Sequence, residues 1–313
     1  MSETGGPIRK LARKIFESVE EQEAFVNAVN EPPEHPPTVL SLTDDILPWK
    51  ILESANGVPE FVFRFPVGSE PSRNPLHDNG AYYCLDYSSA IMASVLLGVP
   101  REPEVVLDAC AAPGGKSVFV SRALEPKYLI SNELVIGRAK ALISNLKRCA
   151  IPNAMVFNFS ADTLGKHLAG ACDLIILDVP CSGQSLMVKG QNVSGTFRDH
   201  VVSGNVKRQR GILARLAPCV RGGGYIAYMT CTFAPDENEK NLVWFMKRFP
   251  NFEAIEVPAL AEFKSHLSDF PSYRVWPHRT PAAGGFAALL KNKEEASASS
   301  TFDPRDFSPI WKS

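Results

Sequence analysis

The chain has 313 residues, of which 45% are hydrophobic and 21% are charged, and its formal net charge is −1. This length is enough to bury one large hydrophobic core and a smaller accessory unit. The sequence has no run of about 18 apolar residues and no charged-then-apolar N-terminal pattern, so we expect neither membrane insertion nor export.

The small net charge conceals two regions of opposite sign. Residues 1–100 contain seven Lys or Arg and fourteen Asp or Glu, whereas residues 101–313 contain 26 and 20. Seven basic residues lie between Lys189 and Arg221, where Asp199 is the only acid. Such a patch is either a solvated helix face or a surface that contacts phosphates.

The cysteine pattern indicates which cellular compartment and which kind of site to expect. The seven cysteines form no CxxC pair and no cluster with histidine, and they lie at positions 84, 110, 149, 172, 181, 219 and 231. Such a set argues against a disulfide framework or a structural metal site, and it favours a reducing, intracellular compartment. We expect a cytoplasmic location, with nuclear and organellar locations left open.

In chain order, the first predicted unit is a small α+β module over residues 1–82. Helical apolar spacing over residues 8–29 stops at the proline-rich segment NEPPEHPP. Short strands are predicted at TVLSL, WKIL and EFVFRFP. PIRKLARKIF alternatively reads as an organellar presequence, but the acidic segment ESVEEQE follows at once.

Residues 83–293 form the second predicted unit, which begins with a helix at 86–99. Strands are expected at 104–110, 128–134, 154–159, 173–179, 223–231, 252–257 and 285–291. Helices are expected between them at 115–124, 137–149, 204–217 and 237–248. This alternation predicts an α/β fold with a mostly parallel sheet and helices on both faces. The polar segment 294–313 is predicted to be a flexible tail.

The turn after the first strand of this sheet is the first candidate site, because ligands bind at the carboxyl ends of strands in open α/β sheets. DACAAPGGKS, residues 108–117, consists mostly of small residues that let a ligand approach the backbone at a helix N-terminus. A phosphate-binding P-loop is one interpretation. Its pattern, however, needs a glycine at Cys110, and Pro113 removes an amide donor.

An adenosine-binding loop is the other interpretation. Glu133 lies 25 residues after Asp108, at the end of the second strand, close to the interval of about 20 for a ribose-binding acid. Asp162 follows the third strand and is placed to meet the adenine edge, with a turn or helix-capping aspartate as the alternative. This order of groups is the one that a site for S-adenosylmethionine requires.

Two cysteines stand at the same predicted edge of the sheet. Cys181 follows Asp178 in LDVPCSG, and Cys231 ends the fifth strand in MTCTFAPDENE. A thiolate can add to C6 of a pyrimidine, which makes C5 electron-rich enough to attack a methyl sulfonium. One such cysteine would more often be a packing residue, and the spacing does not decide which thiol attacks.

These motifs together resemble a known family. LDACAAPGGKS, NEL, LDVPCSG, YMTCTFAPDENE and RVWPHRTPAAGGFAALLK look like the RNA cytosine C5-methyltransferases of the NOL1/NOP2/Sun (RsmB/RsmF-like) family, from about Tyr83 to Lys291. The resemblance implies a class I, Rossmann-like methyltransferase domain that uses S-adenosylmethionine. It also implies ribosomal or transfer RNA as the substrate.

The resemblance also implies roles for single residues. Cys231 would be the nucleophile and Cys181 would assist product release. Asp178 is a candidate partner of the base, and Lys116 is a nearby cation that favours the thiolate. The implied cofactor contacts are Cys110, Ala111, Ala112, Pro113, Gly114, Gly115, Lys116, Glu133, Arg138, Asp162 and Asp178.

The target cytosine must leave its stack to reach a buried thiol, so we expect an unpaired RNA region with phosphates held on either side. The candidate phosphate contacts lie between the two cysteine motifs and are Lys189, Arg198, Lys207, Arg208 and Arg210. We expect a monomer, in which the N-terminal module or a protein partner sets specificity for one RNA.

Two further classes of protein are alternatives to this one. An amino-directed methyltransferase would carry an Asn/Asp-Pro-Pro-aromatic motif after the fourth strand, which DVPCS does not match. A non-catalytic RNA-binding or assembly factor on the same fold is the main alternative. The presence of both thiols and of the whole cofactor loop argues against it.

Overall fold

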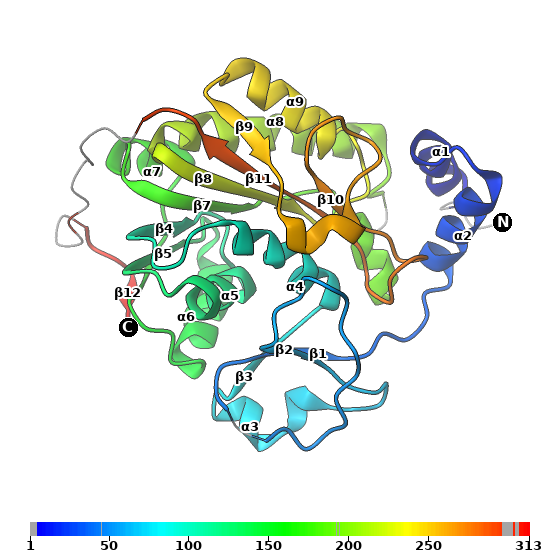
Figure 1. Ribbon diagram of the computed structural model, residues 1–313, viewed down its shortest axis with the longest axis horizontal. Helices are drawn as coiled ribbons and strands as arrows, with labels where there is room; N and C mark the ends of the chain where they lie inside the picture. The colour runs from blue at the N-terminus through cyan, green and yellow to red at the C-terminus, as the bar shows by residue number, and fades with distance from the viewer. Residues whose placement is uncertain (1–4, 45, 192, 194, 296–302, 304–306) are drawn as a thin grey trace.

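The computed structural model describes residues 5–313 except 45, 192, 194, 296–302 and 304–306. Within these residues the chain forms a nine-stranded mixed sheet with helices on both faces and a separate three-stranded sheet. The three-stranded sheet lies below the main sheet in Figure 1, beneath α4. No helix in the described part of the chain is long and apolar enough to cross a membrane.

The centre of the main sheet is parallel. Its strands are β4 (Val105–Asp108), β5 (Tyr128–Asn132), β6 (Ala154–Phe157), β7 (Cys172–Asp178) and β8 (Val220–Thr230). They lie in the order β6-β5-β4-β7-β8. Three antiparallel strands extend the β8 side of the sheet: β11 (Gly285–Asn292), β10 (Tyr273–Val275) and β9 (Phe252–Ile255). The predicted α/β class is confirmed.

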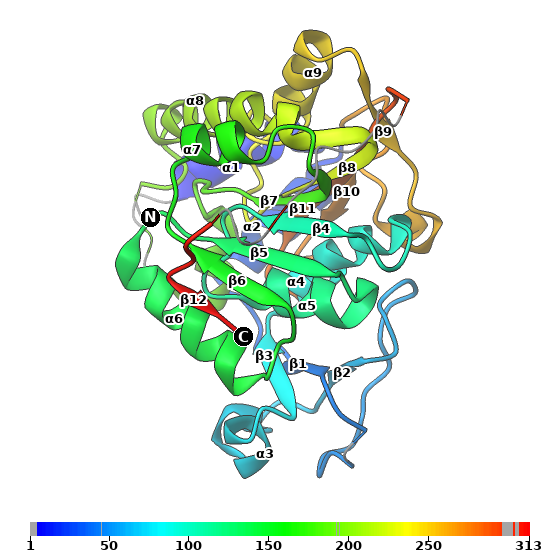
Figure 2. The same cartoon turned by 90° about the vertical axis from the view of Figure 1, so that its left-hand side faces the viewer.

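Helices cover both faces of this sheet (Figures 1 and 2). One face carries α4 (Tyr87–Ala93), α5 (Gly115–Leu124) and α6 (Ile136–Arg148), and the other carries α7 (Ala161–His167), α8 (Asp199–Leu216) and α9 (Glu239–Arg248). Alternate strand residues supply two cores, with Val106 and Ile176 in one and Leu107 and Ile175 in the other. Burial on both faces explains why these strands have nearly continuous apolar sequences.

Short helices and 3-10 turns complete the fold. They are α3 (Pro75–Asp78), η1 (Pro71–Arg73), η2 (Ser94–Gly98), η3 (Gln184–Lys189), η4 (Ala217–Cys219) and η5 (Pro258–Phe263). The helix predicted at 86–99 is therefore divided into α4 and η2. The helix predicted to begin at residue 204 begins at Asp199 instead.

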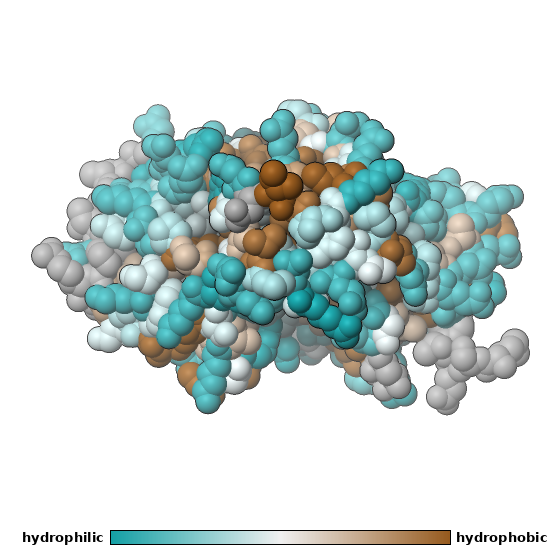
Figure 3. All heavy atoms as spheres, turned by 90° about the horizontal axis from the view of Figure 1, so that it is seen from below, coloured by the Kyte–Doolittle hydropathy of each residue, from teal (hydrophilic) through white to brown (hydrophobic). Residues whose placement is uncertain are grey.

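The three-stranded sheet consists of β1 (Thr38–Ser41), β2 (Val62–Arg64) and β3 (Tyr82–Leu85), all antiparallel. The strand predicted at WKIL is wrong, since only Leu52 makes a single bridge to Arg64. Ile51 is 53% exposed, so this segment buries too little apolar surface to hold a full strand. Seen from the side of this sheet, the surface mixes hydrophilic residues with separate apolar patches (Figure 3).

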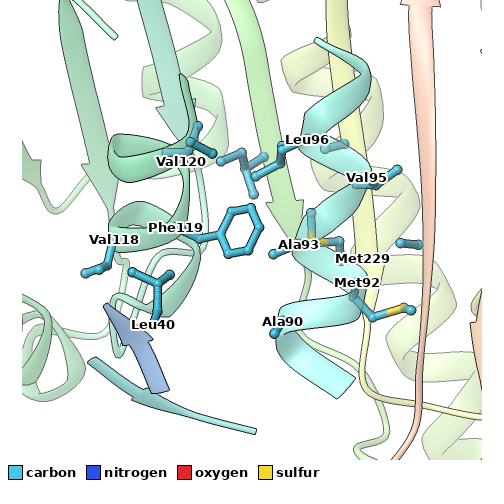
Figure 4. Close-up of a cluster of buried hydrophobic side chains, with 14 of the residues drawn as sticks. Leu40, Ala90, Met92, Ala93, Val95, Leu96, Val118, Phe119, Val120 and Met229 are labelled. Atoms are coloured by element: carbon cyan, nitrogen blue, oxygen red, sulfur yellow. The ribbon is translucent and has the colours of Figure 1, made fainter. Parts of the chain in front are cut away.

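The small sheet shares a core with the large one. Leu40 of β1 lies beside Val118 and Phe119 of α5, and Phe119 points toward α4 and η2 (Figure 4). Because β3 extends to Leu85, the predicted module boundary at residue 82 falls inside a strand. The small sheet is therefore fixed to the main domain by buried side chains.

The N-terminal helix predicted over 8–29 is two helices, α1 (Gly5–Ile15) and α2 (Val19–Asn30). The break arises because the Ser18 hydroxyl accepts a hydrogen bond from the backbone of Glu21 and caps α2. The two helices pack against Phe233 and Trp276 of the main domain. These two helices are therefore held against the main domain by buried side chains.

The predicted flexible tail is wrong for its last residues. β12 (Trp311–Lys312) pairs antiparallel with β6, and the amides of Ile310 and Ser313 donate to Val156 and Ala154 at 2.8 and 2.9 Å. The free edge of β6 provides the hydrogen-bonding groups, and Trp311 packs against the core. Residues 296–302 and 304–306 of the predicted tail lie outside the described residues.

A buried ion pair joins β10 to α9 and gives a stability prediction. Arg274 Nε and Nη2 lie 2.7 and 2.5 Å from the Glu239 carboxylate, and both side chains are almost fully buried. We expect Arg274→Ala to lower the free energy of unfolding by about 3–5 kcal/mol, because it leaves a buried charge without a partner. Chemical denaturation measures the change. Lys240→Ala, which removes an exposed pair with Asp236, should cost at most about 1 kcal/mol.

Candidate active site

The site lies where the strand order reverses. From β4 the chain proceeds to β5 on one side and later places β7 on the other, which opens a crevice at the carboxyl ends of the strands. Asp108 ends β4, Asp178 ends β7, and Cys231 follows β8. The residues that the sequence singled out at strand ends therefore share one edge of the sheet.

The two predicted thiols meet at this edge. Asp178 and Met229 are paired across β7 and β8, so Cys181 and Cys231 leave their strands at similar heights. Their sulfur atoms are 3.1 Å apart. Both residues are partly exposed, and neither forms a disulfide.

The environment shifts the pKa values of the two thiols in opposite directions. The hydrogen bond from the Cys181 thiol to the Cys231 sulfur lowers the pKa of Cys231, while burial and Asp178 oppose this shift. The same hydrogen bond and burial raise the pKa of Cys181. Lys189 and Lys116 help to lower the pKa of Cys231. Cys231 is therefore the thiol that more readily becomes a thiolate.

Two lysines lie beside Cys231. Lys116 Nζ is 2.8 Å from Asp178 Oδ2; burial acts to lower the pKa of Lys116, but Asp178 raises it overall. Lys189, which the sequence marked as a phosphate contact, lines the same pocket and lies 3.6 Å from Asp86. Asp178 thus partly neutralises the charge of Lys116, and Lys189 is a second cation that favours the Cys231 thiolate.

The pocket in front of Cys231 has a volume of about 160 Å³. Its walls include Lys116, Asp178, Ser88 at the start of α4, and Gly284 before β11. Gly284 has φ +106°, and a Cβ there would lie 2.5 Å from the Phe233 ring. Only glycine fits this turn without strain. Because Gly284 has no side chain, its backbone forms part of the pocket wall.

A buried hydrogen-bond network behind the thiols was not found from the sequence. The Glu237 carboxylate accepts from the Ser182 amide at 2.9 Å and from Gln209 Nε2 at 2.8 Å, and the hydroxyls of Ser182 and Thr232 are 2.7 Å apart. Burial raises the pKa of Glu237. Because Ser182 and Thr232 follow the two cysteines, these bonds fix one thiol relative to the other.

The loop after β4 is held from α6. Arg138 Nη2 donates to the Ala112 carbonyl at 2.8 Å, and Asn145 donates to the Pro113 carbonyl at 2.9 Å. Arg138 Nη1 also lies 3.0 Å from Glu133 Oε2, although not in hydrogen-bonding geometry. Burial raises the pKa of the Cys110 thiol, which makes this cysteine a poor nucleophile. Residues 110–115 thus form a supported turn at the start of α5.

Two buried carboxylate oxygens at this edge lack hydrogen-bond donors among the described residues. They are Asp108 Oδ1 and Glu133 Oε2, at the ends of the adjacent strands β4 and β5. The other Asp108 oxygen accepts from Ser117 at 2.7 Å, and burial raises the pKa of Asp108 to about 7. Such acceptors fit a ligand that brings hydroxyl or ammonium donors.

Asp162 has a different setting from the one expected. It lies in the first turn of α7, its side chain is 64% exposed, and its carboxylate pairs with Arg215 of α8 at 2.6 Å. The cap of α7 is Ser160, so Asp162 is not the capping residue. Its contact with an adenine edge stays a prediction.

The residues of the predicted basic patch differ in exposure. Arg210 Nε donates to Asn241 at 2.9 Å, and its guanidinium lies 4.9 Å from the centre of the Trp244 ring. Lys207 and Arg208 are exposed on α8, and Arg198 is exposed at the N-terminus of that helix. The contact of these last three residues with RNA stays a prediction.

The lowered pKa of Cys231 predicts a reactive thiol. We expect iodoacetamide to alkylate Cys231 with a half-maximal rate below the ordinary thiol pKa near 9, because the thiolate is the reacting form. Lys189→Met removes a cation and should move this midpoint to higher pH, whereas Lys247→Met, on the exposed face of α9, should not. Peptide mass spectrometry over a pH series measures both, and equal midpoints in all three proteins would contradict the assignment.

Comparison with known proteins agrees with this geometry. Residues 95–291 match the family model described as 16S rRNA methyltransferase RsmB/F. The ribosomal RNA small subunit methyltransferase F of Klebsiella pneumoniae (strain 342) is 29% identical over 231 residues, which are 72% of this chain and 47% of that protein. The protein of the same name from Escherichia coli (strain K12) is 27% identical over 73% of this chain and 48% of its own length. The chain thus spans about half the length of these curated relatives.

Solved structures share the fold. The structure titled "Crystal Structure of PH0851" has a TM-score of 0.80 and 22% identity, and the match covers 90% of this chain and 65% of that chain. NSun6 from Pyrococcus horikoshii, solved with SFG, has a TM-score of 0.76 and 18% identity, over 92% of this chain and 98% of that chain. At such identities the likeness shows the fold alone, which is that of class I Rossmann-like methyltransferases. Since the family model spans more than half of the sequence, the resemblance of the motifs is confirmed, and the chain belongs to the RsmB/F family of 16S rRNA methyltransferases.

Proposed function

We propose that this protein transfers a methyl group from S-adenosylmethionine to C5 of a cytosine in ribosomal or transfer RNA, through a covalent bond between Cys231 and C6. The observation that carries the proposal is the pair of sulfur atoms 3.1 Å apart at the crevice, of which Cys231 has the lowered pKa. Membership of the RsmB/F family supports the same reaction class.

The residues at the ends of β4 and β5 fit S-adenosylmethionine, which supplies an electrophilic methyl group on a sulfonium when it is bound. Glu133 Oε2 and Asp108 Oδ1 are buried acceptors without donors among the described residues, and the cofactor carries ribose hydroxyls and an ammonium group. We assign the ribose to Glu133. Arg138 acts by holding Ala112 and lying beside Glu133. The small residues of the 110–115 turn leave room for close approach to the backbone.

The chain's own groups account for the first step. The Cys231 thiolate forms a bond to C6 of the cytosine, and the electron pair of the C5–C6 double bond moves toward C5 and N3. Asp178 lines the same pocket and is the proposed partner of N3, to which its protonated carboxyl donates. Lys116 holds Asp178 in place at 2.8 Å.

The second step restores the ring. C5 forms a bond to the methyl carbon as the bond from that carbon to the sulfonium sulfur breaks. C5 then gives its proton to a water molecule or to the Cys181 sulfur, and the electron pair of that C–H bond rebuilds the C5–C6 double bond as the bond between Cys231 and C6 breaks. We assign assistance in this release to Cys181, directly or through a water molecule, because its sulfur is next to that of Cys231.

Transfer of a tritiated methyl group to total RNA tests the proposal. We expect acid-precipitable label with the unmodified protein and none with Cys231→Ala. A protein that binds RNA but transfers no label under any condition tested would favour the non-catalytic alternative. Bisulfite sequencing of RNA from cells with and without the protein then identifies the cytosine.

A further inference from the structure

A second cavity, of about 460 Å³, lies between the three-stranded sheet and the main domain. Its walls come from residues 53–55, Arg64 at the end of β2, Tyr87 at the start of α4, residues 262–264 at the end of η5, and residues 279–281. In Figure 1, η5 is the short orange helix above α4, and the three-stranded sheet lies below α4. No part of the proposed reaction uses this cavity.

Arg64 gives this cavity its chemistry. The residue is only 8% exposed, its guanidinium carbon lies 4.1 Å from the centre of the Tyr87 ring, and Nη1 donates to the Glu53 carbonyl at 3.0 Å. Its Nε has no hydrogen-bond partner among the described residues. Within that part of the chain, no carboxylate forms an ion pair with Arg64.

A buried cation without a counter-ion is costly, because burial removes most of its hydration. Arg274, in the wall of the same cavity, shows the usual solution, since Glu239 neutralises it. Arg64 lacks such a partner, so the missing anion is expected from a ligand. Arginine is the side chain best suited to phosphate, which it binds through paired N–H donors.

The rim adds further charge. Lys264 and Arg279 are half-exposed at the cavity wall, where they also pair with Glu256 and Glu21. Glu262 lies at the wall as well and is exposed to solvent. The buried charge of the cavity is therefore positive, whereas its acids are at the solvent boundary.

The cavity is next to the pocket of Cys231. Tyr87 lines the first and Ser88 lines the second, and these residues are consecutive in α4. Pro281 lines the first and Gly284 lines the second, on the same turn before β11. The N-terminus of α4 and the turn before β11 therefore contribute walls to both cavities.

We propose that this cavity binds a backbone phosphodiester of the RNA strand beside the target cytosine, with Arg64 as its main contact. The identity of the strand rests on the proposed function. The cavity thereby makes the small N-terminal sheet part of the RNA-binding surface, although residues 1–100 as a whole contain more acids than bases.

Binding of a single-stranded RNA of about 12 nucleotides, uridine apart from one central cytosine, tests this proposal in the full chain. We expect Arg64→Met to weaken binding about tenfold in fluorescence anisotropy. The slope of log K against log salt should fall by about 0.7, the value for one phosphate of a single strand. Lys127→Met, an exposed lysine paired with Glu104, is the matched control and should change neither. Unchanged affinity and slope in Arg64→Met would overturn the inference.

RNA in which one backbone phosphate is replaced by an uncharged linkage identifies the phosphate that Arg64 binds. A methylphosphonate beside the cytosine should weaken binding to the unmodified protein at one position and have no further effect on Arg64→Met. Equal losses in both proteins at every position would also overturn the inference. Inorganic phosphate at the same salt should compete only weakly with RNA, whereas full competition would identify a site for free phosphate instead.

Two further measurements distinguish a failure of this inference from a folding defect and from a failure of the proposed function. Lys264→Gln changes an exposed rim residue that carries little of the fold, and it should weaken binding two- to threefold, or about 0.5 kcal/mol. Binding is read without a cofactor, and Cys231→Ala should keep it. RNA binding that depends on Arg64 without methyl transfer refutes the proposed function alone, and methyl transfer with binding independent of Arg64 refutes this inference alone.

Discussion

Cys231→Ala is expected to reduce methyl transfer to RNA by at least about a thousandfold, because loss of a covalent nucleophile removes the reaction path rather than one contact. We do not expect Cys181 to replace it, because burial still raises the pKa of the Cys181 thiol after the hydrogen bond to Cys231 is lost. Incorporation of tritiated methyl groups measures the loss.

The control for this variant is Cys84→Ala. Cys84 is a partly buried cysteine of β3, outside the crevice, and burial raises the pKa of its thiol to about 11. It should retain nearly full activity. Affinity for RNA should be unchanged in Cys231→Ala, because the substitution removes a small side chain that carries no charge in its thiol form. Substantial turnover by this variant would exclude Cys231 as the nucleophile.

Cys181→Ala is expected to accumulate a covalent adduct between protein and RNA. The first step needs only Cys231, whereas release of Cys231 needs the assistance that we assign to Cys181. The adduct should run as a slow band on a denaturing gel, and steady-state turnover should fall at least about tenfold. The variant also removes the hydrogen bond that lowers the pKa of Cys231, so adduct formation should shift to higher pH.

The double variant Cys181→Ala/Cys231→Ala is the matched control and should form no adduct. Cys181→Ser, which keeps a small polar group, should accumulate less adduct than alanine if a water molecule mediates release. An adduct that depends on Cys181 and persists in Cys231→Ala would reverse the two roles.

The sequence predicted the parts of the fold and of the site that depend on local pattern. Nearly continuous apolar runs indicated strands buried on both faces, and the order of the strands placed Asp178 and the two cysteines at one edge. The small residues of the 110–115 turn were likewise visible as a loop that opens a helix.

What the sequence could not predict depends on contacts between distant segments. Lys189 pairs with Asp86, and Glu237 binds Gln209 and Ser182. A weak signal for Gln209 exists, since it occupies the same helical stripe as the buried Leu213 and Leu216 of α8. The cavity at Arg64 has no local signal in the sequence, because some of the residues that line it are more than 200 positions apart in the chain.

The predicted bounds of the N-terminal helix and of the C-terminal tail were wrong for a related reason. The break between α1 and α2 comes from a serine cap inside an otherwise helical pattern, and the pairing of Trp311 with β6 depends on an open sheet edge far back in the sequence. Both are decided by which backbone groups lack partners, and that is known only once the tertiary structure is formed.

The covalent bond to Cys231 is the central claim, and RNA transcribed with 5-fluorocytidine in place of cytidine tests it most directly. Fluorine at C5 cannot leave as a proton does, so the enzyme should stop with the methylated base still bonded to its thiol. Protease digestion and mass spectrometry of the trapped protein should find the nucleotide on the peptide that contains Cys231. A nucleotide on the peptide of Cys181, or no trapped protein alongside active methyl transfer, would contradict the account.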